Sequence, residues 1–585
     1  MSKANPRDNT ARGSGPDPRL LVIGGILYTV IGIGLALAAG RHLGASLRGE
    51  DTDNITWNPL DTFLNTVSGK IDFHVVDLVI GLVLIALIVG VAGWLWWRLK
   101  GSKPKTQIDQ AGSRYLSNNQ DVRSLSRDNA AKAAARMFNN DQLASDHPGL
   151  RIGHMPGRKK AGLYSTWEDL YLVIFGPRMG KTTSQVIPAI VDAPGSVVTT
   201  SNKRDIVDDT IGITSARGTV RVFDPQNIAA GFDQEPWFFD PLDYVRRVPD
   251  QMDSAAVGLA DIFRCASRGA DTGGDAYFSQ AGVDLLAQFL LAAALDNRPI
   301  TDVFLWTRDE DNRTPVTVLN QYPEWSQQAE ALEGTYAITE KTRSGIFSQA
   351  AQMCAILGRR SAAQWVTPSA GRQRFDAAEF VRSQSRDTMY VLSKKGADNA
   401  AGLTTALVAT IMVEAEAYGE QSGGRLPVPL VAALDEAANV VKWPELPELY
   451  SHYGSRSIIL MTILQSYVQG VGVWGEHGME AMWSAASVML FGGGVRDEKL
   501  LGKIETLVGV AEEETASVSS NRDGRSISHS TQERKIMTVA DLASMPRGRA
   551  LLLSSNRRPL VAQLEPWWER DWDDHTMQAL TAKAN

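Results

Sequence analysis

Cysteine is nearly missing from this chain, whose 585 residues include only Cys265 and Cys354. Neither belongs to a C-x-x-C pair or has a histidine at metal-ligand spacing, so the sequence provides no disulfide framework and no zinc-type site. Two thiols in so long a chain are typical of a protein whose main part folds in the reducing cytoplasm.

The chain also lacks an excess of positive charge, because it has 59 Lys and Arg residues and 66 Asp and Glu residues, which gives a net charge of −7. Binding to nucleic acid therefore cannot be inferred from the overall charge, and any basic surface must be local. The length is sufficient for about four average domains.

Two long uncharged stretches lie near the N-terminus, Leu20–Gly40 and Leu78–Trp97. Each is close to the ~20 residues that a transmembrane helix needs, although two buried helices of a soluble core are the alternative. Basic residues cluster outside the pair, at Lys3, Arg7, Arg12, Arg19, Arg98, Lys100, Lys103 and Lys105. This distribution predicts that both termini are cytoplasmic. We therefore expect residues 1–100 to be a tail and a two-helix anchor in the inner (cytoplasmic) membrane, with spans 20–40 and 78–97.

The stretch Tyr171–Thr183, YLVIFGPRMGKTT, combines a short apolar run, a glycine loop and a segment that can be helical. This is the phosphate-binding arrangement of P-loop nucleoside triphosphatases, in which loop N–H groups face the phosphates. Lys181 is expected to reach the β- and γ-phosphates, and the Thr182 hydroxyl to hold Mg²⁺. The residues predicted to bind nucleotide are Gly176, Pro177, Arg178, Met179, Gly180, Lys181, Thr182 and Thr183. Phe175 stands where the usual motif has its first glycine, and a tight Gly/Pro turn is the alternative interpretation.

Two further strands end in polar residues that suit the same chemistry. Pro429–Asn439, PLVAALDEAAN, is an apolar strand followed by Asp435 and Glu436. The first acid is expected to hold Mg²⁺ and the second to activate the attacking water, although two acids can also cap a helix. Ser457–Leu464 leads to Gln465, which can contact both γ-phosphate and water or can be an ordinary polar strand end.

Short β-branched runs alternate with helical segments after the phosphate loop, which indicates an α/β fold with a mostly parallel sheet. The expected strands are Leu172–Phe175, Ser196–Thr200, Thr219–Phe223, Thr388–Leu392, Leu430–Leu434, Ile458–Leu464, Ser487–Phe491 and Ala550–Leu553. Ser279–Leu295 has its apolar residues at helical spacing and belongs to a region without a strand series. We expect a stalk at 101–150, a nucleotide-binding domain at 151–253 and 376–570, an all-α domain at 254–375 and a tail at 571–585. Glu512–Gln532 is expected to be a mobile loop.

Taken in order, these motifs resemble the TraG/TraD family of coupling proteins of conjugative type IV secretion. The resemblance covers roughly Gly153–Trp568 and the two spans, and rests on GPRMGKT, VTTSNKRDIV (Val198–Val207), RVFDP (Arg221–Pro225), LDEAANV (Leu434–Val440), GSRSIILMTILQS (Gly454–Ser466) and FGGG..D (Phe491–Asp497). It implies a RecA-like ATPase that uses ATP and Mg²⁺ and forms a homo-hexameric ring at the inner membrane. In this family the motor delivers single-stranded DNA, with its relaxase, to the subunits of the secretion channel.

The resemblance also implies a role for Arg456, which would reach across a subunit boundary to the γ-phosphate bound by a neighbour. An exposed arginine beside a strand is the alternative, and Arg343, Arg374 and Arg386 are rival candidates. The chain has no long tail after Trp568, so we do not expect docking through an extended tail. Two other functions fit the sequence: a receptor for secreted protein substrates, and an FtsK-type double-stranded DNA translocase, which the lack of a recognisable winged-helix end disfavours.

Overall fold

The computed structural model describes residues 18–50, 52, 55–71, 74–100, 107–116, 119–138, 140–232, 234–268, 276–383, 385–396, 400–521 and 524–581. The chain divides into two compact units, Met1–Lys105 and Thr106–Asn585. The predicted N-terminal tail with Lys3, Arg7 and Arg12 lies outside the described residues, as do Lys103 and Lys105 of the predicted stalk.

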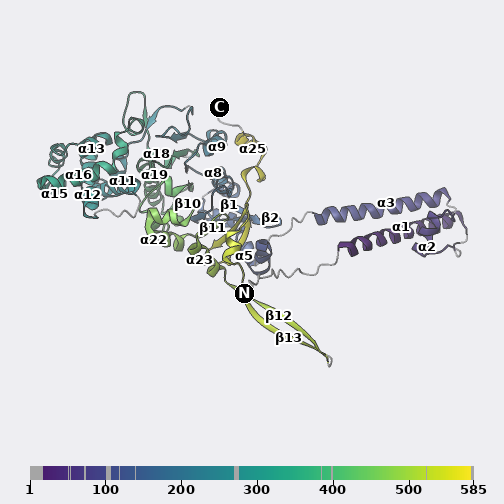
Figure 1. The fold of residues 1–585 in the computed structure, drawn as a ribbon. Coiled ribbons are helices and arrows are strands. Elements are labelled where there is room, and N and C mark those ends of the chain that lie inside the picture. The colour runs from purple at the N-terminus through teal and green to yellow at the C-terminus, as the bar shows by residue number, and fades with distance from the viewer. Residues whose placement is uncertain are drawn as a thin grey trace, which may run out of the picture. The chain divides into compact units, whose positions relative to one another are not determined.

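The first unit consists of three helices, α1 (Pro18–Arg48), α2 (Pro59–Val67) and α3 (Val75–Lys100). The long helices α1 and α3 contain the two predicted spans and lie side by side (Figure 1). Gly40 permits this approach, because a Cβ there would lie 2.6 Å from the backbone oxygen of Asp77. Arg48 Nη1 also pairs with Asp77 Oδ1 at 2.6 Å, which ties the end of α1 to the start of α3.

Length and hydropathy single out one helix that could cross a membrane among the residues that the structure describes fully, Tyr277–Leu295 in the second unit. In that helix 61% of the apolar window is buried inside the protein, as in a core helix. Val75–Val91 of α3 is a shorter apolar helix. The two-span anchor stays a prediction.

The second unit contains an eleven-stranded mixed sheet of order β2-β1-β15-β14-β11-β3-β10-β9-β4-β8-β5. The strands from β11 to β5 are parallel, and β14, β15, β1 and β2 extend the sheet antiparallel. The strands are β1 (Arg151–Met155), β2 (Arg158–Tyr164), β3 (Tyr171–Ile174), β4 (Val197–Ser201), β5 (Val220–Phe223), β8 (Thr388–Leu392), β9 (Leu430–Leu434), β10 (Ile458–Leu464), β11 (Val488–Gly492), β14 (Arg549–Ser554) and β15 (Leu560–Gln563).

All eight strands expected from the sequence are present, with ends shifted by at most one residue. The sequence interpretation missed β1, β2 and β15, which lie together at the antiparallel edge. It also took Glu512–Gln532 for a mobile loop, whereas β12 (Val510–Asn521) and β13 (Gly524–Lys535) form a long hairpin there that projects from the body (Figure 1). The segment is rich in Ser and Glu, so no hydrophobic alternation marked these strands.

Both faces of the sheet are covered, as the alternation of buried residues in β3 shows. Leu172 and Ile174 point into one apolar core, and Tyr171 and Val173 into the other. The first core includes residues of α12, α19 and α22, and the second includes residues of the helices that follow β3 and β4. The principal helices of this part are α8 (Ile187–Asp192), α9 (Asp205–Ser215), α18 (Ala377–Arg382), α19 (Ala401–Gln421), α20 (Ala437–Val440), α21 (Leu446–Leu449), α22 (Tyr467–Ala485), α23 (Glu498–Val508) and α24 (Val539–Ala543).

The region expected to be all-α, 254–375, is mostly helical in its described residues, and its one described strand is β7 at its end. Its helices are α11 (Met252–Arg268), α12 (Ala276–Leu295), α13 (Ile300–Thr307), α14 (Thr314–Leu319), α15 (Ser326–Ala337), α16 (Glu340–Met353) and α17 (Arg360–Ala363). The apolar stripe of α12 that the sequence predicted, including Val283, Leu286 and Phe289, is buried in the first core. A two-stranded parallel sheet pairs β6 (Trp237–Phe238), which precedes this region, with β7 (Gln373–Arg374) at its end.

The segments expected to be a stalk and a tail pack against the same unit. The described part of 101–150 forms α4 (Gln107–Ala111), a π-helical turn (Gly112–Leu116), α5 (Asn119–Ser124), α6 (Arg127–Met137) and α7 (Asp141–Asp146). Ala134 and Phe138 of this segment belong to the second core. At the other end, Leu580 of α25 (Asp574–Thr581) packs against Ile187 of α8. The described parts of the predicted stalk and tail are therefore packed against the second unit.

Candidate functional site

The predicted strand–loop–helix is present around Lys181. Strand β3 ends at Ile174, and a helical turn begins at Lys181 and continues into α8. Arg178 and Gly180 have φ angles of 63° and 90°, so the loop between them turns through the left-handed region. The N–H groups of the first helical turn have no intrahelical acceptor and are available to an anion. The geometry suits phosphate binding.

Three glycines of β11 and the turn after it, Gly492, Gly493 and Gly494, line this loop from the neighbouring strand. The N–H of Gly176 donates to the carbonyl of Gly493 at 3.0 Å. A Cβ on Gly492 would overlap the ring of Phe175, and one on Gly176 would overlap the backbone of Gly494. Because position 492 is a glycine, the buried ring of Phe175 has the space that a side chain there would need. The phosphate loop can therefore begin with Phe175 in place of the usual first glycine.

The two acids predicted after β9 meet the phosphate loop. Lys181 Nζ pairs with Asp435 Oδ1 at 3.0 Å and with Glu436 Oε1, and Thr182 Oγ1 donates to Asp435 Oδ2 at 2.7 Å. All three charged side chains are at most 10% exposed. Burial lowers the pKa of Lys181, but the two carboxylates outweigh it, so the pKa stays above its ordinary value and the ammonium stays charged.

Glu436 is held in a strained backbone conformation, with φ 54° and ψ 37° in the left-handed region. Its Oε1 also accepts from Gln465 Nε2 at 2.5 Å, and its Oε2 accepts from Asn439 Nδ2 at 3.1 Å. Non-glycine residues in this region cost roughly 1–3 kcal/mol and cluster at functional sites. The carboxylate is therefore aimed by three donors from three elements.

Asn439 was not singled out from the sequence. Its signal is its position three residues after Glu436 at the start of α20, since residues three apart on a helix face each other. Thr200 was missed as well. Its hydroxyl donates to the backbone oxygen of Asp435 at 2.6 Å and ties the end of β4 to the acid pair.

The structure does not bring Arg456 to this cluster. It lies just before β10, at the opposite end of that strand from Gln465, and pairs with Glu416 and with Glu420 Oε1, the latter at 2.9 Å. Its rivals have partners of their own, Arg343 with Glu310, Arg374 with Asp243 and Arg386 with His147.

The residues present fit a magnesium nucleotide. Among the residues that the structure describes, no group of three or more His, Cys, Asp or Glu side chains could hold a metal alone. The Thr182 hydroxyl and the Asp435 carboxylate are nevertheless two adjacent oxygen ligands of the kind Mg²⁺ takes. Because Mg²⁺ commonly completes its shell with water and substrate phosphates, this pair suits an ion shared with a nucleotide.

Comparison with known proteins agrees with this picture. Residues 429–547, which include β9, β10 and β11, match the family model described as the TraM recognition site of TraD and TraG. The solved structure of the bacterial conjugative coupling protein TrwBΔN70, unbound monoclinic form, superposes with a TM-score of 0.52 at 14% identity, over 74% of this chain and 91% of that one. TrwB in complex with ADP and Mg²⁺ gives a TM-score of 0.50, also at 14% identity, over 76% and 94%.

A comparison of the sequence with curated proteins found no match. At 14% identity the solved structures show the fold, which confirms the predicted RecA-like P-loop domain with an all-α insertion. The family match covers the strand that carries Asp435 and Glu436, the strand that leads to Gln465 and the glycine lining of the phosphate loop. Residues 429–547 thus match a TraM recognition site of TraD and TraG, and the fold of the chain is similar to that of the conjugative coupling protein TrwB.

Proposed function

We propose that the chain is a membrane-anchored, ATP-driven coupling protein that pumps DNA, single-stranded and with its relaxase, into a conjugative type IV secretion channel. The observation that carries the ATPase part is the convergence of Lys181, Thr182, Asp435, Glu436 and Gln465 at one edge of the sheet. These side chains follow three adjacent strands, β3, β10 and β9, and their convergence supports a common ligand.

Each residue has a defined task in this proposal. Bound Mg²⁺·ATP supplies the phosphoryl group and the cation that neutralises its oxygens. Lys181 binds the β- and γ-phosphate oxygens, while Thr182 and Asp435 hold the ion. Glu436 takes the proton of the attacking water, and Gln465, which already donates to Glu436, orients that water.

The membrane anchor, the hexameric ring and the partners are part of the same proposal. Helices α1 and α3 are long enough for the spans 20–40 and 78–97. Because residues 429–547 match a TraM recognition site, a TraM-like protein is a proposed partner besides relaxase and channel subunits. Reporters fused at Asn54, which lies outside the described residues, and at the C-terminus should report opposite sides of the membrane.

The decisive experiment is ATP hydrolysis by the full chain in detergent or lipid, with and without single-stranded DNA. We expect stimulation by single-stranded DNA and loss of hydrolysis in the Lys181→Ala variant. Hydrolysis that DNA does not change would favour a receptor for protein substrates, and stimulation by double-stranded DNA alone would favour an FtsK-type pump. Transfer at the normal rate by Lys181→Ala would refute the motor.

A further inference from the structure

The helix after the phosphate loop contains an irregular turn next to the proposed catalytic residues. Thr182–Val186 is π-helical, and the N–H of Ile187 donates to the carbonyl of Thr182, five residues back. In a regular α-helix the carbonyl of Ser184 would accept from residue 188. That residue is Pro188, which has no N–H and whose ring crowds the same carbonyl.

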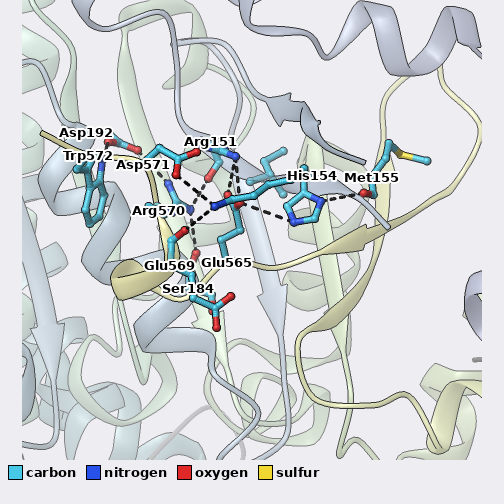
Figure 2. A network of polar contacts seen from close by, with 12 residues as sticks. Arg151, His154, Met155, Ser184, Asp192, Glu565, Glu569, Arg570, Asp571 and Trp572 are labelled. Carbon is cyan, nitrogen blue, oxygen red and sulfur yellow. Dashed lines mark hydrogen bonds and ion pairs between the residues drawn. The ribbon is translucent and has the colours of Figure 1, made fainter. Parts of the chain in front are cut away.

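Arg570, from the C-terminal segment, takes the place of the missing donor. Its Nη2 donates to the carbonyl of Ser184 at 3.2 Å and to that of Arg151 in β1 at 2.8 Å, and its Nη1 pairs with Asp192 Oδ2 at 3.2 Å (Figure 2). The side chain is only 2% exposed. One guanidinium thus joins the π-helical turn, the end of α8 and the antiparallel edge of the sheet.

Neighbouring contacts fix these acceptors and the segment that carries Arg570. Glu565 Oε2 pairs with Arg151 Nη2 at 2.8 Å, and Trp572 Nε1 donates to Asp192 Oδ1 at 3.2 Å (Figure 2). Gln185, within the π-helical turn, donates to the carbonyl of Ile152 at 2.9 Å and provides a second tie to β1. The turn is therefore held from outside the helix at two successive residues.

An ion pair that buries an arginine, with its aspartate partly exposed, is poorly explained by stability alone. Burial lowers the pKa of Arg570 and raises the pKa of Asp192, so both charges lose free energy of hydration on folding. Apolar replacements of such pairs are often neutral or stabilising. What apolar residues cannot do is donate to the carbonyl that Pro188 leaves open.

The geometry points to Arg570 as a positioning residue of the nucleotide site: by donating to Ser184 it fixes the π-helical turn, and with it the Thr182 hydroxyl and the Lys181 ammonium. Ser184 is two residues from Thr182 in the same turn and three from Lys181, which directly precedes the turn. The consequence for hydrolysis rests on the function proposed above, whereas the effect on the turn does not.

The first test replaces Arg570 by lysine in the full chain. Lysine keeps the charge, but a compact ammonium cannot serve three acceptors in the fixed directions of a guanidinium. In nucleotide-free protein we expect hydrogen exchange of the amides of residues 184–192 to accelerate at least tenfold. In hydrolysis we expect kcat to fall about tenfold or more and the apparent affinity for Mg²⁺ to weaken, since ångström-scale misplacement is costly.

Arg549→Lys is the matched control. Arg549 makes a two-pronged pair with Asp109, at 2.7 and 3.0 Å, but touches neither the phosphate loop nor α8. This variant should leave exchange at residues 184–192 and the Mg²⁺ dependence unchanged. If Arg570→Lys lowers only the melting temperature, with exchange and kinetics as in the control, Arg570 is a structural residue and the inference is wrong.

A second variant tests the role of the proline. Pro188→Ala supplies an N–H that can donate to Ser184, so Pro188→Ala/Arg570→Lys should show slower exchange at residues 184–192 than Arg570→Lys alone. If Arg570→Lys does not fold, recovery of folded protein in the double variant would equally support the role of Arg570 as the substitute donor to Ser184. No recovery in either form would overturn the inference. Accelerated exchange in Arg570→Lys, with no ATP hydrolysis in the wild type, would refute the proposed function and retain the role of Arg570 in the turn.

Discussion

The ring of Phe175 occupies the space into which a side chain at Gly492 would project. Phe175 replaces the first glycine of the usual phosphate-binding motif, directly follows β3 and is fully buried in the second apolar core. The usual motif has no side chain at this position, and the Phe175 ring fits only because Gly492, about 320 residues further along the sequence, leaves room for it.

Gly492→Ala should therefore damage both the fold and the nucleotide site. The Cβ overlaps a ring that packing holds in place, and such overpacking costs about 1–3 kcal/mol of unfolding free energy. Weaker binding of a fluorescent ADP analogue should accompany it, because the ring is next to Gly176. The control is Gly502→Ala in α23, where a Cβ meets no atom within 4 Å and alanine should be neutral or stabilising. Equal urea midpoints for the two variants would contradict the packing argument.

Glu436→Gln should separate nucleotide binding from hydrolysis. The amide oxygen can still accept from Lys181 and Gln465, and Asn439 can turn its amide to accept from the new NH₂ group. Since glutamine cannot take a proton from water, hydrolysis should fall by a factor of ~10² or more. ATP should still bind in an equilibrium assay.

Asn439→Ala is the companion variant for Glu436. It removes one donor to the carboxylate while leaving the general base in place. We expect a smaller loss of kcat than in Glu436→Gln, of about tenfold. A variant that loses nucleotide binding together with its fold would show that these residues act as a structural helix cap.

Arg456 can act only across a subunit boundary, if it acts on phosphate at all. It precedes a strand of seven residues that ends beside Gln465, and such a strand is about 23 Å long. In rings that mix Arg456→Ala with Lys181→Ala subunits, some hydrolysis should return, because an intact phosphate loop then meets an intact arginine. Arg456 must leave Glu416 and Glu420 to do so. Inactive rings that are shown to be mixed would count against the finger.

The sequence predicted the parallel half of the sheet and the site residues that local pattern marks. Buried parallel strands are continuous apolar runs, and Lys181, Asp435 and Gln465 each follow one of them. What the sequence could not show depends on contacts between distant segments. The role of Gly492 becomes apparent only from its contact with Phe175. The role of Arg570 becomes apparent only from its hydrogen bond to Ser184, the residue whose carbonyl Pro188 cannot serve.

His147 provides a prediction about pH that is independent of nucleotide. Its Nε2 accepts from Arg386 at 2.7 Å, so its Nδ1 carries the proton and donates to the carbonyl of Asp192 at 2.8 Å. Burial, and then the positive charges of Arg386 and Arg217, lower the pKa of His147 to about 4, against the opposing effects of the hydrogen bond to the carbonyl of Asp192 and, more weakly, of the charge of Asp146. The neutral imidazole is the form that fits the fold.

Below pH 6.5 the unfolded chain binds a proton at His147 that the folded chain refuses until about pH 4. The unfolding free energy should therefore be fully retained above pH 6.5 and fall as the pH drops from 6.5 to 4, by up to about 3 kcal/mol from this group. His147→Gln cannot titrate, so urea unfolding of this variant should lose that part of the pH dependence. His575→Gln, at an exposed position in α25, should keep the wild-type slope. Identical slopes for His147→Gln and the wild type would show that His147 is accessible to protons in the folded chain.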